Sequence, residues 1–365
     1  MSQIKSISIQ GFKSVASIQD LELRPLNVLI GANGSGKSNF FNAMKMLRAS
    51  VINLGEFSEY VAKSGGADRL LHFGSKISSR ISFDVNFKDD KCKFNAIYSA
   101  TTNDKLYVNL SIKDESILQE IENIGSKPGI PSFLKYLVPR LHKWRLYHFL
   151  DTTDTSPMKR MANVHDNRRL REDGSNLSSF LYLLQEKYPA DYSSIRHTVQ
   201  LAAPFFDNFH LEPLKHNERM MLLEWKHLGT DAYFDASSFS DGTLRFIALA
   251  TLLLQPVSMR PSVILLDEPE IGLHPYAIDL LVAMLRQASL ESQIIVATQS
   301  PILLDYFEPE DVIVADRVDG ATEFNRLETD RLAAWLEDYS LGELWEKNYL
   351  GGRPAPETSK DTQGE

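Results

Sequence analysis

The sequence of 365 residues lacks several features that would place it in particular classes of protein. Its single cysteine, Cys92, excludes an internal disulfide framework and a cysteine-rich zinc site, and it favours a reducing compartment. The longest apolar run, residues 246–254, is too short to cross a bilayer. The first residues, MSQIKSISIQGFKS, lack the apolar core of a signal peptide. We therefore expect a cytoplasmic protein with no membrane partner.

An overall positive charge is lacking as well. The formal net charge is −9, while 43% hydrophobic and 24% charged residues are ordinary for a globular protein. Contact with nucleic acid would therefore have to come from a local basic patch. The length suffices for one large domain or two ordinary ones. No internal repeat is found.

A glycine-rich phosphate loop is the most specific motif that is present. Residues 31–38, GANGSGKS, fit the pattern G-x-x-x-x-G-K-[ST], follow the apolar run LNVLI and precede the helical pattern SNFFNAMKML. The backbone N–H groups of such a loop surround a phosphate, its lysine reaches the β- and γ-phosphates, and its hydroxyl reaches Mg²⁺. The sequence therefore predicts bound ATP with Mg²⁺, against the alternative of a glycine turn without a ligand. The expected nucleotide-binding residues are Asn33, Gly34, Ser35, Gly36, Lys37, Ser38 and Asn39, with Ser38 also on the metal.

A second apolar strand ends in two acids. In SVILLDEPE, residues 262–270, four apolar residues precede Asp267 and Glu268. We expect Asp267 to hold Mg²⁺. Glu268, one residue on, is expected to point to the opposite side of the strand and to deprotonate an attacking water. A plain β-turn is the alternative interpretation.

A glycine-containing turn precedes an unusually apolar helix. SFSDGTLRF, residues 238–246, leads into IALATLLLQPV, and the turn suggests a helix N-terminus that is open to an outside anion. A phosphate loop, a Ser-x-Gly turn and a strand ending in Asp-Glu, in this order, resemble the ATPase domain of the ABC superfamily. The resemblance implies that Ser240 and Gly242 cap the γ-phosphate of ATP on a second copy of the chain, in a head-to-tail homodimer that forms with ATP.

Further stretches resemble one branch of that superfamily. IKSISIQGFKSV resembles the first strand and turn of the RecF/SMC branch, which makes Lys13 a further candidate at the nucleotide. DEPEIGLHP, VATQSPILLD and DYSLGELWEKNYLGG resemble stand-alone bacterial AAA-type ATPases related to the OLD and RecF families, without coiled coil or nuclease domain. The implied fold is an α/β P-loop NTPase of the ABC-ATPase head type, with an N-terminal mixed β-sheet lobe, a parallel core sheet and a helical lobe. The expected domains are lobe I at 1–110, a helical and irregular insertion at 111–237, lobe II at 238–350 and a disordered tail at 351–365.

Two positions depart from the family pattern. Gln299 stands where most relatives carry a histidine after a strand. A glutamine can donate a hydrogen bond to the γ-phosphate or hold the water, but it cannot take a proton, so hydrolysis is expected to be slow. No glutamine lies between residues 39 and 118, so the family's glutamine loop is missing or differently built, and Gln119 is a candidate by elimination only.

The middle of the chain limits the choice of partners. About two hundred residues separate the phosphate loop from the Ser-x-Gly turn, with prolines and polar loops and without sustained heptads, which excludes long coiled-coil arms. An OLD-type nuclease module is not expected, so any nuclease or toxin would be a separate partner. Two basic groups are candidates for DNA contact, and solvated surface charge is the alternative. The groups are Lys159, Arg160, Arg168, Arg169 and Arg171 within 159–171, and Lys135, Arg140, Lys143 and Arg145.

Trp144, Tyr147 and Phe149 are expected to pack in the core rather than to stack on bases, and His274 to be a hydrogen-bonding residue of a loop that faces the dimer partner. Two functions remain open. The first is an ATP-binding and ATP-hydrolysing dimerisation switch of the RecF/OLD type in DNA maintenance or anti-phage defence. The second is a nucleotide-gated scaffold with little turnover that holds or releases a partner nuclease or toxin, and Gln299 favours it. A transporter subunit is disfavoured by GFKS and GLHP.

Overall fold

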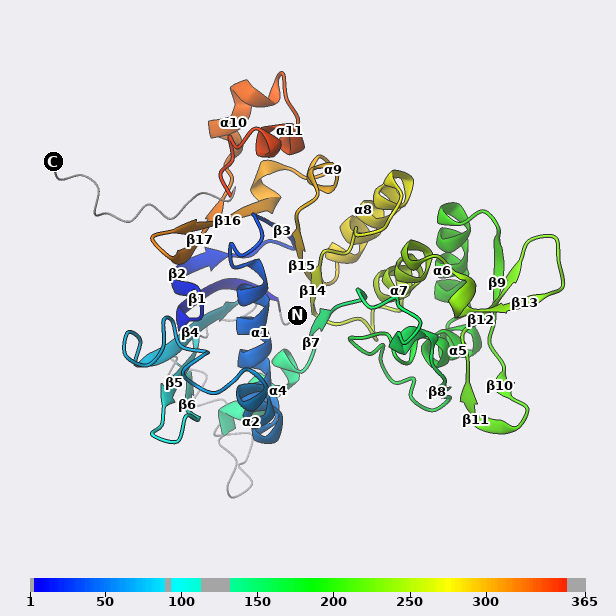
Figure 1. Ribbon diagram of the computed structural model, residues 1–365, viewed down its shortest axis with the longest axis horizontal. Coiled ribbons are helices and arrows are strands. Elements are labelled where there is room, and N and C mark those ends of the chain that lie inside the picture. Colours follow the sequence, from blue (N-terminus) through cyan, green and yellow to red (C-terminus); the bar gives the residue numbers. More distant parts are fainter. Residues whose placement is uncertain (1–2, 89–92, 113–131, 353–365) are drawn as a thin grey trace. The chain divides into compact units, whose positions relative to one another are not determined.

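The computed structural model describes residues 3–88, 93–112 and 132–352 (Figure 1). The chain divides into two compact units, one made of Met1–Trp144 with Ala297–Glu365 and the other of Arg145–Val296. The expected boundaries at 110, 237 and 350 stay a prediction. Of the expected tail, only Gly351 and Gly352 lie among the described residues. No described helix is both long and apolar enough to cross a membrane.

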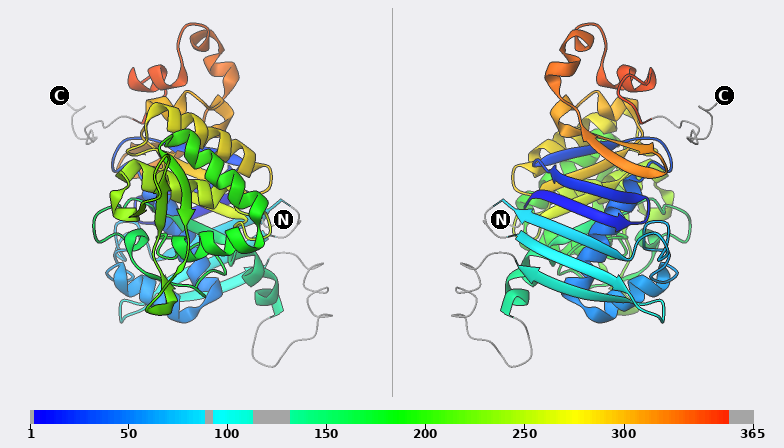
Figure 2. Two further views of the ribbon diagram at one scale, coloured as in Figure 1. Left: turned by 90° about the vertical axis from the view of Figure 1, so that its right-hand side faces the viewer. Right: turned by 90° about the vertical axis from the view of Figure 1, so that its left-hand side faces the viewer.

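An antiparallel sheet forms one layer of the first unit. Its five strands follow the order β2-β1-β4-β5-β6, and the right-hand view of Figure 2 shows them side by side. Buried positions alternate along β4, whose Phe83 lies opposite Ile9 on one neighbour and Ala96 on the other, as expected for a sheet with one covered face. The strands are β1 (Ile4–Phe12), β2 (Val15–Glu22), β4 (Arg80–Phe87), β5 (Lys93–Ala100) and β6 (Leu106–Ile112).

The phosphate-loop segment forms the other layer of this unit. Strand β3 (Leu26–Ile30) is buried along its whole length and leads into helix α1 (Lys37–Ile52). Strand β16 (Val312–Val318) runs parallel to β3, and β17 (Ala321–Arg326) pairs antiparallel with β16. Helices α2 (Leu54–Lys63) and α4 (Ser132–Leu141) pack against α1.

Short helices complete the first unit. Helix α11 packs against α9, where the Gly342 N–H donates to Asp305 Oδ1 at 2.6 Å. These helices are α9 (Pro301–Leu304), the 3₁₀ turn η3 (Pro309–Asp311), α10 (Thr329–Leu336) and α11 (Leu341–Glu346).

The second unit combines buried core strands with helices. Its strands follow the order β15-β14-β7, and almost every residue in them is buried, as in a sheet covered on both faces. Helices α7 and α8 pack on each other, and α6 packs on both. The elements are β7 (Trp144–Tyr147), β14 (Val263–Asp267), β15 (Gln293–Thr298), α5 (Leu177–Lys187), α6 (Pro189–Ala202), α7 (Asp241–Leu254) and α8 (Pro275–Ser289).

Two small sheets are formed by strands between residues 162 and 235 of this unit, in the orders β10-β11-β8 and β13-β12-β9. Strand β9 ends at His210 and β10 begins at Pro213, which has no N–H for a continuous ladder. The strands are β8 (Ala162–Asn163), β9 (Phe206–His210), β10 (Pro213–Leu214), β11 (Asn217–Met221), β12 (Glu224–His227) and β13 (Tyr233–Asp235), with the 3₁₀ turns η1 (Pro157–Lys159) and η2 (Ala236–Ser238). The predicted fold class, an α/β P-loop NTPase, is confirmed. The N-terminal sheet, expected to be mixed, is antiparallel, whereas β3 and β16 pair in parallel and β16 and β17 antiparallel.

Candidate functional site

The predicted phosphate loop lies between β3 and α1. Gly36 is the residue before α1 and has φ 110°, and α1 starts with neither a side-chain cap nor an acidic residue in its first turn. The first N–H groups of a helix have no partner within the helix. Such an N-terminus, without a cap or a nearby acid, suits an anion.

Three residues of the loop fit a phosphate group. Lys37 is 5% exposed, and its Nζ donates to the Gly31 carbonyl at 2.5 Å and to the Ala32 carbonyl at 3.1 Å. Ser35 Oγ is buried and has no hydrogen-bond partner within the described residues. At Gly34, with φ 81°, an added Cβ would meet nothing within 4 Å. A buried ammonium, an unpartnered hydroxyl and open space thus occur together, and Ser38 beside them is exposed.

The Phe12-Lys13-Ser14 turn is held beside this loop. Asn39 Nδ2 and Thr322 Oγ1 each donate to Ser14 Oγ at 2.7 Å. A Cβ on Gly36 would lie 2.2 Å from Thr322 Oγ1, so only glycine fits there. The side-chain amide of Asn39, expected at the nucleotide, holds this turn in the structure.

Lys13 has a constrained backbone. Its φ of 48° is left-handed, which costs a residue other than glycine about 1–2 kcal/mol. Two hydrogen bonds hold it there, from its N–H to the Leu70 carbonyl at 2.9 Å and from His72 Nδ1 to its own carbonyl at 2.6 Å. Burial lowers the pKa of the Lys13 ammonium.

Gln299 also lies at the loop. It follows β15, and its Nε2 donates to Asn33 Oδ1 at 2.8 Å. Ser300, the next residue, caps α9 by accepting the Leu303 N–H at 3.2 Å. The structure therefore brings Gln299, which replaces the histidine of the family pattern, to the phosphate loop. Gln299 and Asn33 are 266 residues apart in the sequence.

A contact from the C-terminal part of the chain was missed by the sequence reasoning. The Ala32 N–H donates to the Gly352 carbonyl at 2.7 Å, and the Gly352 N–H donates to Asp316 Oδ2 at 3.3 Å. A Cβ on Gly352 would lie 3.3 Å from the Cα of Gly31. The paired glycines at 351–352 were the available sign that a backbone approaches closely here.

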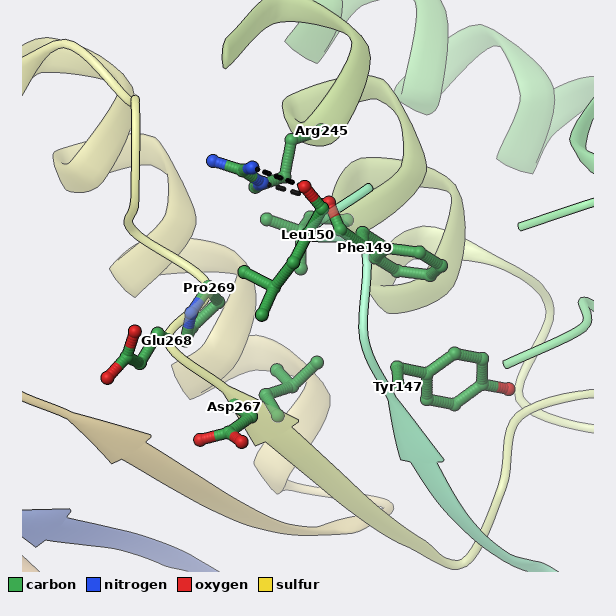
Figure 3. Close-up of a pocket in the computed structure, with 9 residues that line it drawn as sticks. Tyr147, Phe149, Leu150, Arg245, Asp267, Glu268 and Pro269 are labelled. Carbon is green, nitrogen blue, oxygen red and sulfur yellow. Dashed lines mark hydrogen bonds between the residues drawn. The ribbon is translucent and has the colours of Figure 1, made fainter. Parts of the chain in front are cut away.

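In the second unit, β14 ends at the two acids. The strand stops at Asp267, and Glu268 has a left-handed φ of 47°. The expectation that Glu268 points to the opposite side of the strand is wrong, because side-chain alternation holds only for extended residues. In Figure 3 the two carboxylates extend toward the same side of the strand end.

His148 lies beside the first acid and was not recognised from the sequence. It follows β7, the strand next to β14, and its Nδ1 is 3.8 Å from Asp267 Oδ2. The side chain of His148 is 43% exposed and that of Asp267 is 15% exposed. A polar residue directly after a short, largely aromatic and aliphatic strand, as in WRLYH, was the available sign.

A buried arginine joins three segments around these acids. Arg245, on α7, donates from Nε to the Phe149 carbonyl at 2.9 Å and from Nη2 to the Leu150 carbonyl at 3.2 Å (Figure 3). Its Nη1 donates to the Ile271 carbonyl. Burial lowers its pKa, and the charges of Asp241 and Glu270 oppose that shift. The cavity lined by Arg245 and the two acids has a volume of about 10 Å³, room for about one water.

The helix after the Ser-x-Gly turn is capped, contrary to the expectation of an open N-terminus. Ser240 Oγ accepts the Thr243 N–H at 3.2 Å and lies 2.8 Å from Thr243 Oγ1. Ser240 itself is exposed. At Gly242 an added Cβ would lie 2.1 Å from the Gly272 carbonyl oxygen, so the close approach of the loop after β14 explains this glycine.

The basic candidates differ in accessibility. Arg168, Arg169 and Arg171 are exposed, and Arg171 also forms an ion pair with Asp166 at 2.6 Å, which raises its pKa. Arg145 is buried and lies 3.9 Å from Glu172. The segment 150–176, which reads as irregular, is ordered by buried Asn176. Its side chain donates to the carbonyls of Asp166 and Arg169 and accepts the N–H of Arg171.

The remaining expectations have mixed outcomes. Trp144, Tyr147 and Phe149 are buried, which confirms their packing role. His274 caps α8 by accepting the Tyr276 N–H at 3.3 Å, so it is a hydrogen-bonding residue, while the dimer-facing loop stays a prediction. Gln119 lies outside the described residues. Within them, no three His, Cys, Asp or Glu side chains form a metal cluster.

Comparison with known proteins gives a family and a fold. The family model described as "AAA domain, putative AbiEii toxin, Type IV TA system" matches residues 26–305. A structure of an Smc head bound to the C-winged helix domain of ScpA covers 91% of this chain and 99% of its own, at 16% identity and TM-score 0.60. The Smc head with an extended coiled coil from Pyrococcus furiosus, bound to the C-terminal domain of ScpA, covers 92% and 99% at 14% identity and TM-score 0.61. The fold is thus that of an α/β P-loop NTPase resembling the SMC head.

Two curated relatives match only in part. The chromosome partition protein Smc of Desulfitobacterium hafniense is 40% identical over 75 residues, which are 20% of this chain and 6% of the relative. Urease accessory protein 2 of Cryptococcus neoformans is 38% identical over 183 residues, which are 44% of this chain and 13% of the relative. The chain therefore spans a small part of either relative.

Proposed function

Because the chain belongs to the family described as "AAA domain, putative AbiEii toxin, Type IV TA system", a family of P-loop ATPases, we propose that it is an ATP-driven dimerisation switch. ATP binding closes two copies head to tail, and hydrolysis reopens them. The switch acts in DNA maintenance or anti-phage defence with a partner effector. The observation that carries the proposal is the uncapped start of α1 beside Lys37, Ser35 and Gly34.

Different residues of the chain bind the phosphates of ATP, hold the metal and take the proton. The α1 amides and Lys37 neutralise the phosphates, and Lys13 adds a cation at the same end of α1. Asp267 and Ser38 would hold Mg²⁺, which when bound would shield the phosphate charge. Glu268 takes the proton of the attacking water.

Slow turnover is part of the proposal. Gln299 is hydrogen-bonded to Asn33 of the phosphate loop, where its amide can position a water or the γ-phosphate. An amide cannot accept the proton that a histidine would take at this position, which leaves Glu268 as the base. A long-lived ATP-bound dimer follows.

Removing the loop ammonium tests the nucleotide site. Lys37→Ala should weaken binding of a fluorescent ATP analogue with Mg²⁺ by about a hundredfold, because a charge-assisted contact with phosphate is lost. Lys45→Ala, an exposed lysine farther along α1, is the matched control and should bind as the unaltered protein does. An affinity of Lys37→Ala within threefold of the unaltered protein would refute the site.

Replacing the exposed arginines distinguishes the second function, a nucleotide-gated scaffold without DNA contact, from the first. If DNA is bound, replacing Arg168 and Arg169 with alanine should reduce the slope of log affinity against log salt by about two units, one for each lost phosphate contact. Arg171 is left in place because Asp166 already pairs with it. No binding of duplex or single-stranded DNA at low salt with ATP present would favour the scaffold.

A further inference from the structure

The segment after β7 brings an imidazole to the proposed metal-binding acid. β7 and β14 are neighbouring strands, and His148 and Asp267 stand at their ends with 3.8 Å between Nδ1 and Oδ2. That distance is longer than a hydrogen bond but is within reach of a bridging water or a small rotation of either side chain. His148 is 43% exposed, so the imidazole is not held there by core packing.

Arg245 fixes the backbone that carries this imidazole. The two carbonyls that it binds after β7 belong to Phe149 and Leu150, the residues directly after His148. Its remaining donor reaches Ile271, in the loop that follows Glu268. One buried side chain therefore ties the His148 segment to the loop of the two acids, and such support keeps the imidazole near Asp267.

We propose that His148 is a positioning residue that orients the Asp267 carboxylate for the divalent metal. The inference rests on the proposed function of Asp267. Carboxylates that bind metals usually have hydrogen-bonding partners of their own, and loss of such a partner lowers metal affinity about 10–100-fold. His148 Nδ1 lies 3.8 Å from Asp267 Oδ2, so we take the imidazole to act through this carboxylate rather than as a further ligand.

The glutamine of the family pattern has no candidate among the described residues before β7, because Gln119 lies outside them. Between β3 and β7 the described residues contain no glutamine that could contact the metal from this side. His148 offers an N–H donor at the end of β7, which is what a metal-bound carboxylate or water requires.

The test is a titration of Mg²⁺ at a fixed concentration of fluorescent ATP analogue, with His148→Ala, His148→Asn and the unaltered full chain. The amide of asparagine places an N–H close to the position of the imidazole Nδ1. His148→Ala should raise the Mg²⁺ concentration at half-saturation about tenfold, and His148→Asn should restore it to within about threefold. Binding of the analogue in EDTA should be the same in all three. His216→Ala, an exposed histidine of the same unit, is the control.

The outcomes separate this inference from the proposed function. Equal Mg²⁺ half-saturation in His148→Ala and the unaltered chain would overturn the role of His148 while leaving the nucleotide site in place. An asparagine variant as defective as the alanine variant would overturn it too, because the shared donor would then not matter. If the unaltered chain bound the analogue without any effect of Mg²⁺, the proposed role of Asp267 would fail instead. Thermal unfolding of each variant shows whether it is folded.

Discussion

Two candidate residues have left-handed backbones although neither is glycine. Lys13 has φ 48° and Glu268 has φ 47°. For a residue with a side chain, such a conformation costs about 1–3 kcal/mol of conformational free energy. The residue stays in this conformation only where neighbouring contacts enforce it. At Glu268 the conformation turns the carboxylate to the side of Asp267, which an extended residue would not do (Figure 3). The strained backbone of Glu268 therefore places its carboxylate beside that of Asp267. The sequence could not show this, because it does not reveal the backbone φ of a single residue.

The strain at Glu268 predicts an unusual order of stability. Glu268→Gly should be more stable than Glu268→Ala by about 1 kcal/mol, because glycine adopts φ 47° without strain. At an ordinary helix position the order would be reversed. Urea unfolding of both variants measures the difference, and both should lack ATP turnover because the proposed base is gone. An alanine variant that is the more stable of the two would mean that φ is relaxed in solution.

Individual elements were predictable where the information is local. The strand LNVLI, its glycine-rich loop and α1 were predicted because an apolar run, glycines and a helical pattern are adjacent in the sequence. That β7 and β14 are neighbours in the sheet could not be predicted, because the two strands lie more than a hundred residues apart in the sequence. The same holds for Arg245 with Phe149, 96 residues apart, and for Ala32 with Gly352. Local sequence also misled at α7, where an open helix N-terminus is expected and Ser240 caps the helix instead.

The contact between α7 and the loop after β14 makes a prediction about Gly242. A Cβ there would lie 2.1 Å from the Gly272 carbonyl oxygen, a backbone atom that cannot rotate away. Gly242→Ala should therefore destabilise the protein by about 2 kcal/mol, although alanine is the better helix former. Thr243→Ala on the same turn removes one hydroxyl contact and should cost about 0.5 kcal/mol. Chemical unfolding compares the two, and a Gly242→Ala protein as stable as Thr243→Ala would show that the loop gives way.

At the scale of the whole molecule, the turn at Ser240 indicates whether one copy of the chain or two would form the complete nucleotide site. In one chain, Ser240 Oγ is engaged by Thr243, and the Asp241 carboxylate lies in the first turn of α7, where it opposes an anion. A phosphate can therefore bind at this turn only if other groups neutralise its charge. Lys37 and Mg²⁺ on a second copy would do so. In the proposed dimer this would make closure conditional on bound nucleotide, as a switch requires.

A hydrolysis-deficient variant should convert this condition into a stable dimer. Glu268→Gln keeps the size of the side chain but removes the proposed base, so ATP stays bound and the two copies stay closed. Light scattering with ATP and Mg²⁺ should then show about twice the mass of one chain, 41.3 kDa, and without nucleotide a single chain. Adding Ser240→Asp should abolish the dimer, because aspartate preserves the cap of α7 but repels the γ-phosphate. Adding Ser237→Asp instead, at an exposed serine just before the cap, should leave the dimer intact. A Glu268→Gln/Ser240→Asp protein that still dimerises with ATP would mean that this turn does not face the nucleotide of the partner.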